Sequence, residues 1–219
     1  LSGMGLLLAL KWQRHNGGDD MPLGANKVAL FGMGGVSTAD VVLIEKTTMA
    51  GEAYYRATFD SAYVSAIFAF SGIVCDANDT DMTFQVSTSG DSYGVSAANV
   101  AWRTLNSTGG SDGTSFPLAA MSQAAATTHM DLSNALSDDA TNDGSILNGF
   151  IQIYNPKSAV YGKNFMSVEI GNVASGDSFG QWGSSGYIDT ASALDKIEFK
   201  LDNPAANMDA GTISYWGVK

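Results

Sequence analysis

Short runs in which apolar and polar residues alternate recur along the chain from about residue 41 to its end. Residues 82–87, Met-Thr-Phe-Gln-Val-Ser, alternate cleanly, which is the pattern of a strand with one buried and one polar face. Two apolar sets interleave within residues 63–74, and one contains Phe68 and Phe70 while the other contains Ile67. This stretch therefore predicts a central strand that is covered on both sides.

Clusters of Gly, Asp, Asn and Ser separate the other strand-like runs. These runs cover residues 41–48, 52–60, 100–105, 148–154, 165–170, 179–188, 194–201 and 211–218. In one of them, Ile197, Phe199 and Leu201 share a face opposite Glu198 and Lys200, which predicts a half-buried strand with a solvated side. About ten strands without a βαβ rhythm predict an all-β fold, a two-sheet jelly-roll β-sandwich.

The chain has 219 residues, and one sandwich can use nearly all of them. We expect a single β-sandwich domain over residues 36–219, preceded by an extended N-terminal arm over residues 1–35. Residues 118–128 are the one stretch with helix-like composition, and they predict either a short helix or a long crossover loop.

The expected arm contains the apolar residues Leu6, Leu7, Leu8, Leu10 and Trp12. Their run is too short to span a bilayer, and the nearest positive charges follow it, which is the reverse of a secretory signal. We therefore expect an amphipathic segment that docks on a neighbouring subunit. The chain opens on Leu, and the alternative starts at Met4 and Met21 stay open.

The composition excludes several classes of partner. Hydrophobic residues make up 45% of the chain and charged residues 15%, and 22 acids against 11 bases give a net charge of −11. Nucleic-acid binding depends on Lys and Arg, so we expect no nucleic-acid partner, and no basic cluster marks a membrane-binding site. The single cysteine, Cys75, excludes an intrachain disulfide, and its apolar surroundings predict a small buried thiol.

Two segments match the G-x-S-x-G pattern of a serine nucleophile. They are Gly90-Asp-Ser-Tyr-Gly94 and Gly176-Asp-Ser-Phe-Gly180, and neither is followed by the helical pattern that a nucleophile elbow requires. The two imidazoles of the chain are His15, within the expected arm, and His129, which has no Asp three residues before it. We therefore interpret both segments as turns and expect no enzymatic activity.

The acidic loop at residues 138–144 partly fits a calcium site. Asp139 and Asp143 stand at ligand positions, but Phe150 occupies the place of the bidentate Glu, which excludes an EF-hand. A looser Ca²⁺ site formed by Asp138, Asp139 and Asp143 stays open as an alternative, and so does one formed by Asp76, Asp79 and Asp81. We predict no cofactor.

Trp102, Trp182, Tyr187 and Trp216 are candidates for a sugar-stacking platform, although such rings in a β-sandwich usually belong to the core or to a subunit interface. Trp182 lies in the most polar surroundings, Phe179-Gly-Gln-Trp-Gly-Ser-Ser-Gly186. It is therefore the best candidate in this set for an exposed ring that contacts a ligand.

Several segments of the chain form a combination that points to one family. They are residues 22–32 leading to 42–44, 58–63, 67–73, 150–156, 193–199 and the ending Gly211-Thr-Ile-Ser-Tyr-Trp-Gly-Val218. Together they resemble a family of small structural proteins encoded by tailed bacteriophages, especially those of marine and cyanobacterial hosts. The ending is the strongest mark of the resemblance, with Trp216 where the relatives usually have Tyr.

This resemblance implies a virion component that is assembled in the host cytoplasm, either a capsid decoration, a fibre subunit or a tail appendage. It also implies contacts with other virion proteins and a homo-oligomer, for which a trimer is the common arrangement. The alternative is a carbohydrate-binding module of a tail fibre that recognises host glycan with Trp182 and nearby polar loops.

Overall fold

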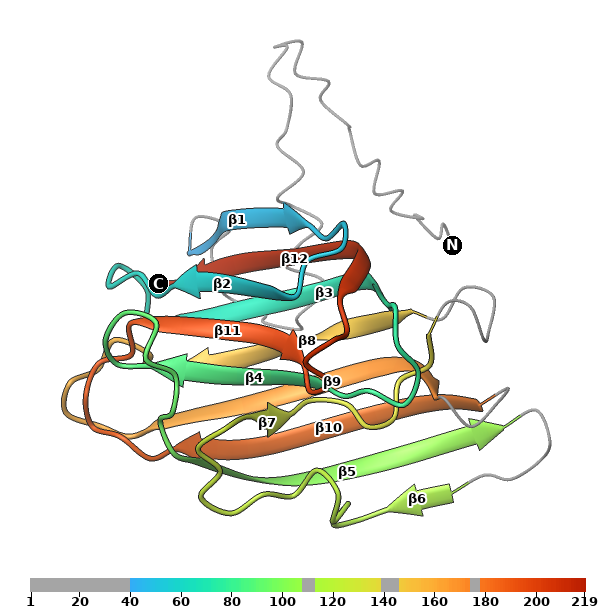
Figure 1. Ribbon diagram of the computed structural model, residues 1–219. Coiled ribbons are helices and arrows are strands. Elements are labelled where there is room, and N and C mark those ends of the chain that lie inside the picture. The colour runs from blue at the N-terminus through green and yellow to red at the C-terminus, as the bar shows by residue number, and fades with distance from the viewer. Residues whose placement is uncertain (1–39, 108–112, 139–145, 174–177) are drawn as a thin grey trace, which may run out of the picture. The chain divides into compact units, whose positions relative to one another are not determined.

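A computed structural model describes residues 40–107, 113–138, 146–173 and 178–219 (Figure 1). Twelve strands and no helix are assigned in these ranges. The strands are β1 (Val41–Thr48), β2 (Tyr54–Thr58), β3 (Ser65–Cys75), β4 (Met82–Ser87), β5 (Ala97–Ser107), β6 (Gly113–Ser115), β7 (Met130–Asp131), β8 (Leu147–Tyr154), β9 (Lys163–Val173), β10 (Ser178–Ile188), β11 (Lys196–Leu201) and β12 (Met208–Val218). No helix of the described part is long and apolar enough to cross a membrane.

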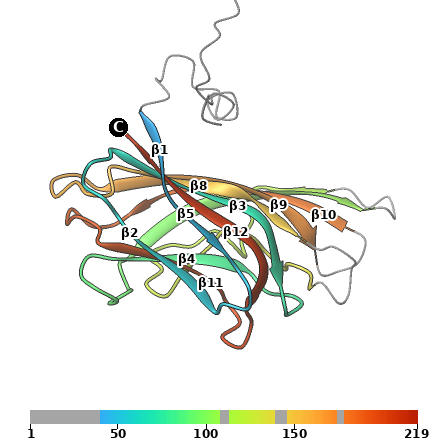
Figure 2. The same ribbon diagram turned by 90° about the horizontal axis from the view of Figure 1, so that it is seen from above.

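The strands form two antiparallel sheets, which confirms the predicted all-β sandwich. The wide sheet has the order β1-β12-β3-β8-β9-β10-β5-β6, and the small sheet has the order β2-β11-β4-β7. Figure 2 shows the small sheet packed beneath one face of the wide sheet. All of these strands belong to one compact unit, Ala39–Lys219.

Aromatic rings from both sheets fill the space between them. Phe68 of the wide sheet stacks on Tyr215 at 4.6 Å between ring centroids and contacts Phe199 of the small sheet at 5.1 Å. Phe84 of the small sheet meets Phe165 of the wide sheet edge-on at 5.0 Å. These rings alternate with outward residues along their strands, and their contacts join the two sheets into one core.

The part of the wide sheet formed by β9, β10 and β5 has a different inner layer. Trp182 of β10 is completely buried there. A Cβ at Gly180 would lie 2.8 Å from the indole Cζ2, and a Cβ at Gly171 of the adjacent strand would lie 3.4 Å from Cζ3. The glycines on either side of the ring therefore provide the room that the indole occupies.

The structure confirms all ten predicted strand segments, with small changes at their ends. For residues 118–128 the predicted helix is wrong, and the crossover loop is correct. Within the segment one turn forms, in which Met121 N and Ser122 N donate to Leu118 O. The segment also bonds to β5, because Leu118 N donates to Ala101 O and Asn99 N donates to Gln123 O. The predicted buried thiol is confirmed, and burial raises the pKa of Cys75 to about 12.

The predicted solvated side of β11 is wrong at Glu198, which is only 5% exposed. Arg56 of the adjacent strand covers it, with Nη2 2.5 Å from Glu198 Oε2. The guanidinium also lies over the Tyr54 ring, 4.1 Å from its centroid. A charged residue is buried here because its partner and an aromatic ring replace water.

Gly180→Ala tests the packing around Trp182. The added Cβ would lie within 3.0 Å of both the indole and Val173 Cγ2, inside the core, so we expect a loss of about 1–3 kcal/mol in the free energy of unfolding. Chemical denaturation measures it. Gly162→Ala is the matched control, since a Cβ there meets nothing within 4 Å. Equal stability of the two variants would contradict the tight packing.

Candidate functional site

The outward face of the wide sheet carries a group of apolar side chains, which we call the outer patch. It consists of Val100 and Trp102 of β5, Met166, Val168 and Ile170 of β9, and Phe179 and Tyr187 of β10. Tyr187 is 51% exposed, Val100 48% and Phe179 47%. These exposures are large for rings and branched side chains in the middle of a sheet.

Local sequence positions the side chains of the outer patch. Successive strand residues point to opposite faces, so the burial of Trp182 turns Phe179 and Tyr187 outward. Trp102 stands opposite Gly183 in the register, where a Cβ would lie 2.4 Å from the indole Cε2. The ring therefore lies flat on the backbone of β10 and joins the side chains of β5 to those of β9.

Charge distinguishes the two outer faces of the sandwich. None of the outward positions described on β3, β5, β8, β9 and β10 carries a charged side chain. The outward positions of the small sheet, by contrast, include Arg56, Lys196, Glu198 and Lys200. The chain as a whole has a net charge of −11, but on these strands the outer patch is surrounded by neutral residues.

Polar side chains beside the outer patch bond to one another. Gln152 Nε2 donates to Ser65 Oγ at 2.9 Å, and Ser65 Oγ donates to the carbonyl of Ile153 at 3.2 Å. The Tyr154 hydroxyl lies 3.2 Å from Gln152 Oε1 and 3.3 Å from Met166 Sδ. These groups have less need of water as partners, which lowers the cost of covering the face.

A shallow depression opens at one end of the outer patch. Val100, Ser185 and Tyr187 line it together with Ala98. Apolar atoms dominate its lining, and the aromatic ring of Tyr187 forms one wall. This arrangement suits contact with an apolar or ring-shaped group.

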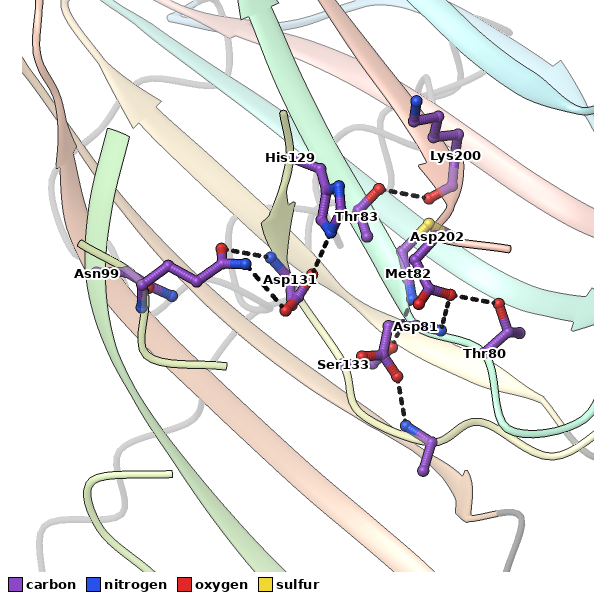
Figure 3. A network of polar contacts seen from close by, with 12 residues as sticks. Thr80, Asp81, Met82, Thr83, Asn99, His129, Asp131, Ser133, Lys200 and Asp202 are labelled. Carbon is purple, nitrogen blue, oxygen red and sulfur yellow. Dashed lines mark hydrogen bonds and ion pairs between the residues drawn. The ribbon is translucent and has the colours of Figure 1, made fainter. Parts of the chain in front are cut away.

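A second candidate site is a polar network at the end of the small sheet (Figure 3). Asp202 Oδ1 accepts hydrogen bonds from Thr80 Oγ1 at 2.7 Å and from Asp81 N at 2.8 Å. Asp81 Oδ1 in turn accepts one from Ala135 N at 2.6 Å. The carboxylates therefore tie the start of β4 to the end of β11 and to the loop after β7.

Asp131 extends this network toward β5. Its Oδ2 accepts a hydrogen bond from Gln123 Nε2 at 3.2 Å, and its Oδ1 lies 3.4 Å from His129 Nε2. Burial, reinforced by the charges of Asp81 and Asp202, raises the pKa of Asp131 to about 7. Burial also raises the pKa of Asp81 to about 6, and the charge of Asp202 adds to the shift.

The network supports a structural role better than a catalytic one. Raised carboxyl pKa values mark candidate acids and bases, but Asp81 and Asp202 accept hydrogen bonds from the backbone. Within the described residues, no group of three or more carboxylate, imidazole or thiolate side chains is placed to hold a metal ion. We therefore interpret the network as the fastening of the loop at residues 132–138.

A fully buried carboxyl lies on the inner face of β9. Glu169 Oε2 accepts a hydrogen bond from Ser167 Oγ at 3.2 Å, whereas Oε1 has no hydrogen-bond partner. The Ser167 hydroxyl is 3.1 Å from that of Ser184. Burial raises the pKa of Glu169 well above its ordinary value, so the neutral carboxyl is favoured in the folded protein.

The predicted exposure of the Trp182 ring is wrong, because the ring is completely buried and belongs to the core, as is usual for such rings in a β-sandwich. The polar and glycine-rich stretch around it belongs to β10, and the small residues accommodate the ring instead of exposing it. Tyr187 is the exposed ring among the four predicted aromatic candidates, while Trp102 and Trp216 are partly buried.

Only part of the predicted calcium sites falls within the described residues. Asp138 forms an isolated bridge with Cys75, and Asp139 and Asp143 lie outside the described residues. In the other set, Asp76 accepts hydrogen bonds from the backbone and side-chain nitrogens of Asn207. Asp76 thus joins two loops, as Asp81 does in the network.

The first G-x-S-x-G segment forms the predicted turn between β4 and β5. Ser87 Oγ donates to Gly90 O at 2.7 Å, and Ser92 N donates to Ser89 O at 3.3 Å. In the second segment, Ser178 begins β10, while residues 176 and 177 lie outside the described residues. A strand rather than a helix follows each serine.

The arm residues Leu6, Leu7, Leu8, Leu10 and Trp12 also lie outside the described residues, as does His15. Sequence reasoning missed the outer patch. The sequence signal for the outer patch was the apolar residues at alternate positions of β9, Met166, Val168 and Ile170. The residues between them, Ser167 and Glu169, are polar.

Asp131→Asn tests the buried carboxyl of the network. Below about pH 4 the Asp131 carboxyl is protonated in both states, and as the pH rises towards its pKa of about 7 the unfolded state alone releases the proton. The wild type therefore loses stability relative to Asp131→Asn between about pH 4 and 7. Denaturant titrations at four pH values measure the difference.

The matched control for Asp131→Asn is Asp91→Asn. Lys196 holds the pKa of the exposed Asp91 carboxyl below its ordinary value of 3.8, so its stability difference from the wild type should stay constant between pH 5 and 7.5. The interpretation of Asp131 fails if the two substitutions have the same pH profile. Repeating the comparison in a His129→Gln background removes any contribution from the imidazole.

Glu169→Gln tests the inner carboxyl of β9. The unfolded chain releases this proton near the ordinary value of 4.5, whereas the buried carboxyl releases it only at a higher pH, so the Gln variant should gain stability relative to the wild type as the pH rises above 4.5. Thermal unfolding across this range is the measurement. Glu198→Gln should lose stability instead, because it breaks the pair with Arg56. Parallel profiles for wild type and Glu169→Gln would refute the neutral carboxyl.

No protein-family model matches this chain, and neither curated proteins nor solved structures show a detectable match to it.

Proposed function

We propose that this protein is a non-enzymatic structural component of a phage particle, exposed on the virion as a capsid decoration, a fibre subunit or a tail appendage. The observation that carries the proposal is the outer patch, an exposed apolar surface on a neutral sheet face of an otherwise acidic chain. A large apolar patch with neutral surroundings is typical of a protein interaction surface. A subunit that assembles with other virion proteins needs such a surface.

We also propose that the sandwich is a jelly roll with an extended sheet. In favour of this, the strands β1-β12-β3-β8 are neighbours in the wide sheet, and the strands β2-β11-β4-β7 form the small sheet. The chain passes between these two sets of four strands in the order that two Greek keys produce in an eight-stranded jelly roll. The remaining strands, β9, β10, β5 and β6, continue the wide sheet beyond β8. Jelly rolls are frequent in viral capsid proteins and in lectins, so the fold suits a virion subunit and a glycan-binding module alike.

The second candidate function is a carbohydrate-binding module that recognises host glycan. It now depends on β10, where the outward residues alternate between aromatic and polar side chains: Phe179, Gln181, Ser185 and Tyr187. A flat ring can stack on the C–H face of a sugar while amide and hydroxyl groups bond to its hydroxyls. The exposed ring of Tyr187 replaces the buried Trp182 in this proposal.

The expected arm provides the test of the proposed function. A full-length chain should co-purify with particles of the phage that encodes it, and a variant lacking residues 1–35 should fold yet stay off the particles. Mass spectrometry of purified particles measures incorporation, and circular dichroism with thermal unfolding checks the fold. The unit Ala39–Lys219 lies wholly beyond the deletion, so the variant keeps every described strand.

Absence of the full-length chain from particles would overturn the proposed function, and full incorporation of the deletion variant would overturn the role of the arm. A glycan array separates the two candidate functions. A decoration subunit should bind no glycan, whereas binding that is lost in Tyr187→Ala would favour the carbohydrate-binding module.

A further inference from the structure

We infer that the outer patch is a self-association surface on which a second copy of this chain docks with its own outer patch. The inference rests on the proposed structural role and adds the partner and the surface. It begins from β9 and β5. The charged residues Lys163, Glu169 and Arg103 point inward there, beside buried apolar residues such as Phe165, whereas the apolar residues of the outer patch occupy the outward positions.

Charge favours a second copy as the occupant. Two chains that each carry a net charge of −11 repel one another, and burying unpaired carboxylates at their contact would add a large desolvation cost. The outward positions described on β8, β9, β10 and β5 contain neither an acid nor a base. Two copies that meet through this face therefore bury no charge.

The available area is close to that of a stable dimer. Strands β5, β9 and β10 have eleven residues each, and β8 lies beside them. With strand spacings of about 4.8 Å and rises of about 3.3 Å per residue, four strands present a face of roughly 19 by 36 Å, or roughly 700 Å². A standard interface covers about 800 Å² on each partner, and side chains corrugate the face and enlarge it.

The side chains of this face are those of an interface core. Trp102, Phe179, Tyr187 and Met166 belong to the residue types that are enriched there, and Lys, Glu and Asp, which are depleted there, are missing from its described positions. The bonds that Gln152 makes with Ser65 and Tyr154 satisfy polar groups before docking. Covering the face would thus leave the polar groups of these three residues with partners.

When the outer patch of one copy docks on the outer patch of another, a two-fold axis passes through the contact. Such an isologous contact uses the same residues on both chains and closes as a dimer. The trimer expected from the family resemblance would instead join the outer patch to a different surface. The outer face of the small sheet is a poor partner, because it carries Arg56, Lys196, Glu198 and Lys200.

The test is the molar mass of the full-length chain and of charged variants by light scattering and sedimentation over a range of concentrations. Met166→Lys and Ser185→Lys each place an ammonium group in adjoining positions of the outer patch, where Met166 and Ser185 are partners in the register. Each changes the net charge from −11 to −10, so weaker association would not come from greater overall repulsion. Val160→Lys is the control, since Val160 is 71% exposed in the loop between β8 and β9.

We expect a dimer for the wild type and for Val160→Lys, and an increase of at least about 30-fold in the dimer Kd for both patch variants. Circular dichroism confirms that each variant is folded. Dimers that both patch variants leave unchanged would overturn the inference, because association would then use another surface.

Labelling of an introduced cysteine identifies what covers the face. The one native thiol, Cys75, is buried, so maleimide reacts with Ser185→Cys or with the control Val160→Cys. The labelling rate of Ser185→Cys should fall as the protein concentration rises, whereas that of Val160→Cys should not. A monomer labelled rapidly at every concentration has a free face, and a monomer protected at every concentration is covered by its own chain. Either result overturns the inference.

These results are independent of the test of the proposed function. A monomeric chain that is incorporated into particles would overturn the self-association surface alone, and a dimeric chain that is absent from particles would overturn the virion role alone.

Discussion

The buried indole of Trp182 determines which side of the extended sheet faces the interior. Side chains alternate along a strand, so one inward residue sets the direction of every other residue in β10 and, through the register, in β9 and β5. Gly180 and Gly171 leave the space that the ring fills. A side chain at either position would enter this space. Phe165 and Val173 of β9 are buried on the same side, and the outer patch occupies the alternate, outward positions of these strands.

The same orientation makes the interior beneath these strands unusually polar. Buried polar atoms without a hydrogen-bond partner include Asn99 Nδ2, Arg103 Nε, Glu169 Oε1 and Trp182 Nε1. Each costs free energy, so this half of the sandwich is less favourably packed than the aromatic half around Phe68 and Phe199. These strands bury polar groups such as the Glu169 carboxyl and Arg103 Nε among apolar residues while they expose apolar residues outward, so they gain a binding surface at the expense of the core.

The two outer faces of the sandwich therefore suit different surroundings. On the small sheet, Glu198 is shielded by Arg56, and Lys196 is paired with Asp91 at 2.9 Å, so the charges there are arranged in networks that tolerate water. On the wide sheet the neutral outer patch favours contact with another molecule. A particle subunit with one neutral side and one charged side can attach through the first and expose the second, which agrees with the function we propose.

The sequence by itself determined ten of the twelve strands, because alternation and turn residues are local signals, and it missed the short strands β6 and β7. Residues 82–87 and 41–48 agree with β4 and β1 to the residue. It also determined the buried thiol of Cys75 and the turn at Gly90, since each depends on immediate neighbours.

Only the tertiary structure decided which alternate set faces inward. In β9, Met166 and Val168 are more apolar than Ser167 and Glu169, yet the second pair is buried. The reason is physical: Ser167 and Glu169 share their face with Phe165 and Val173 of the same strand and, through the register, lie on the side of Trp182, so the strand is oriented as a whole and not residue by residue. For the same reason the sequence suggested Trp182 as an exposed ring, while the folded chain buries it and exposes Tyr187.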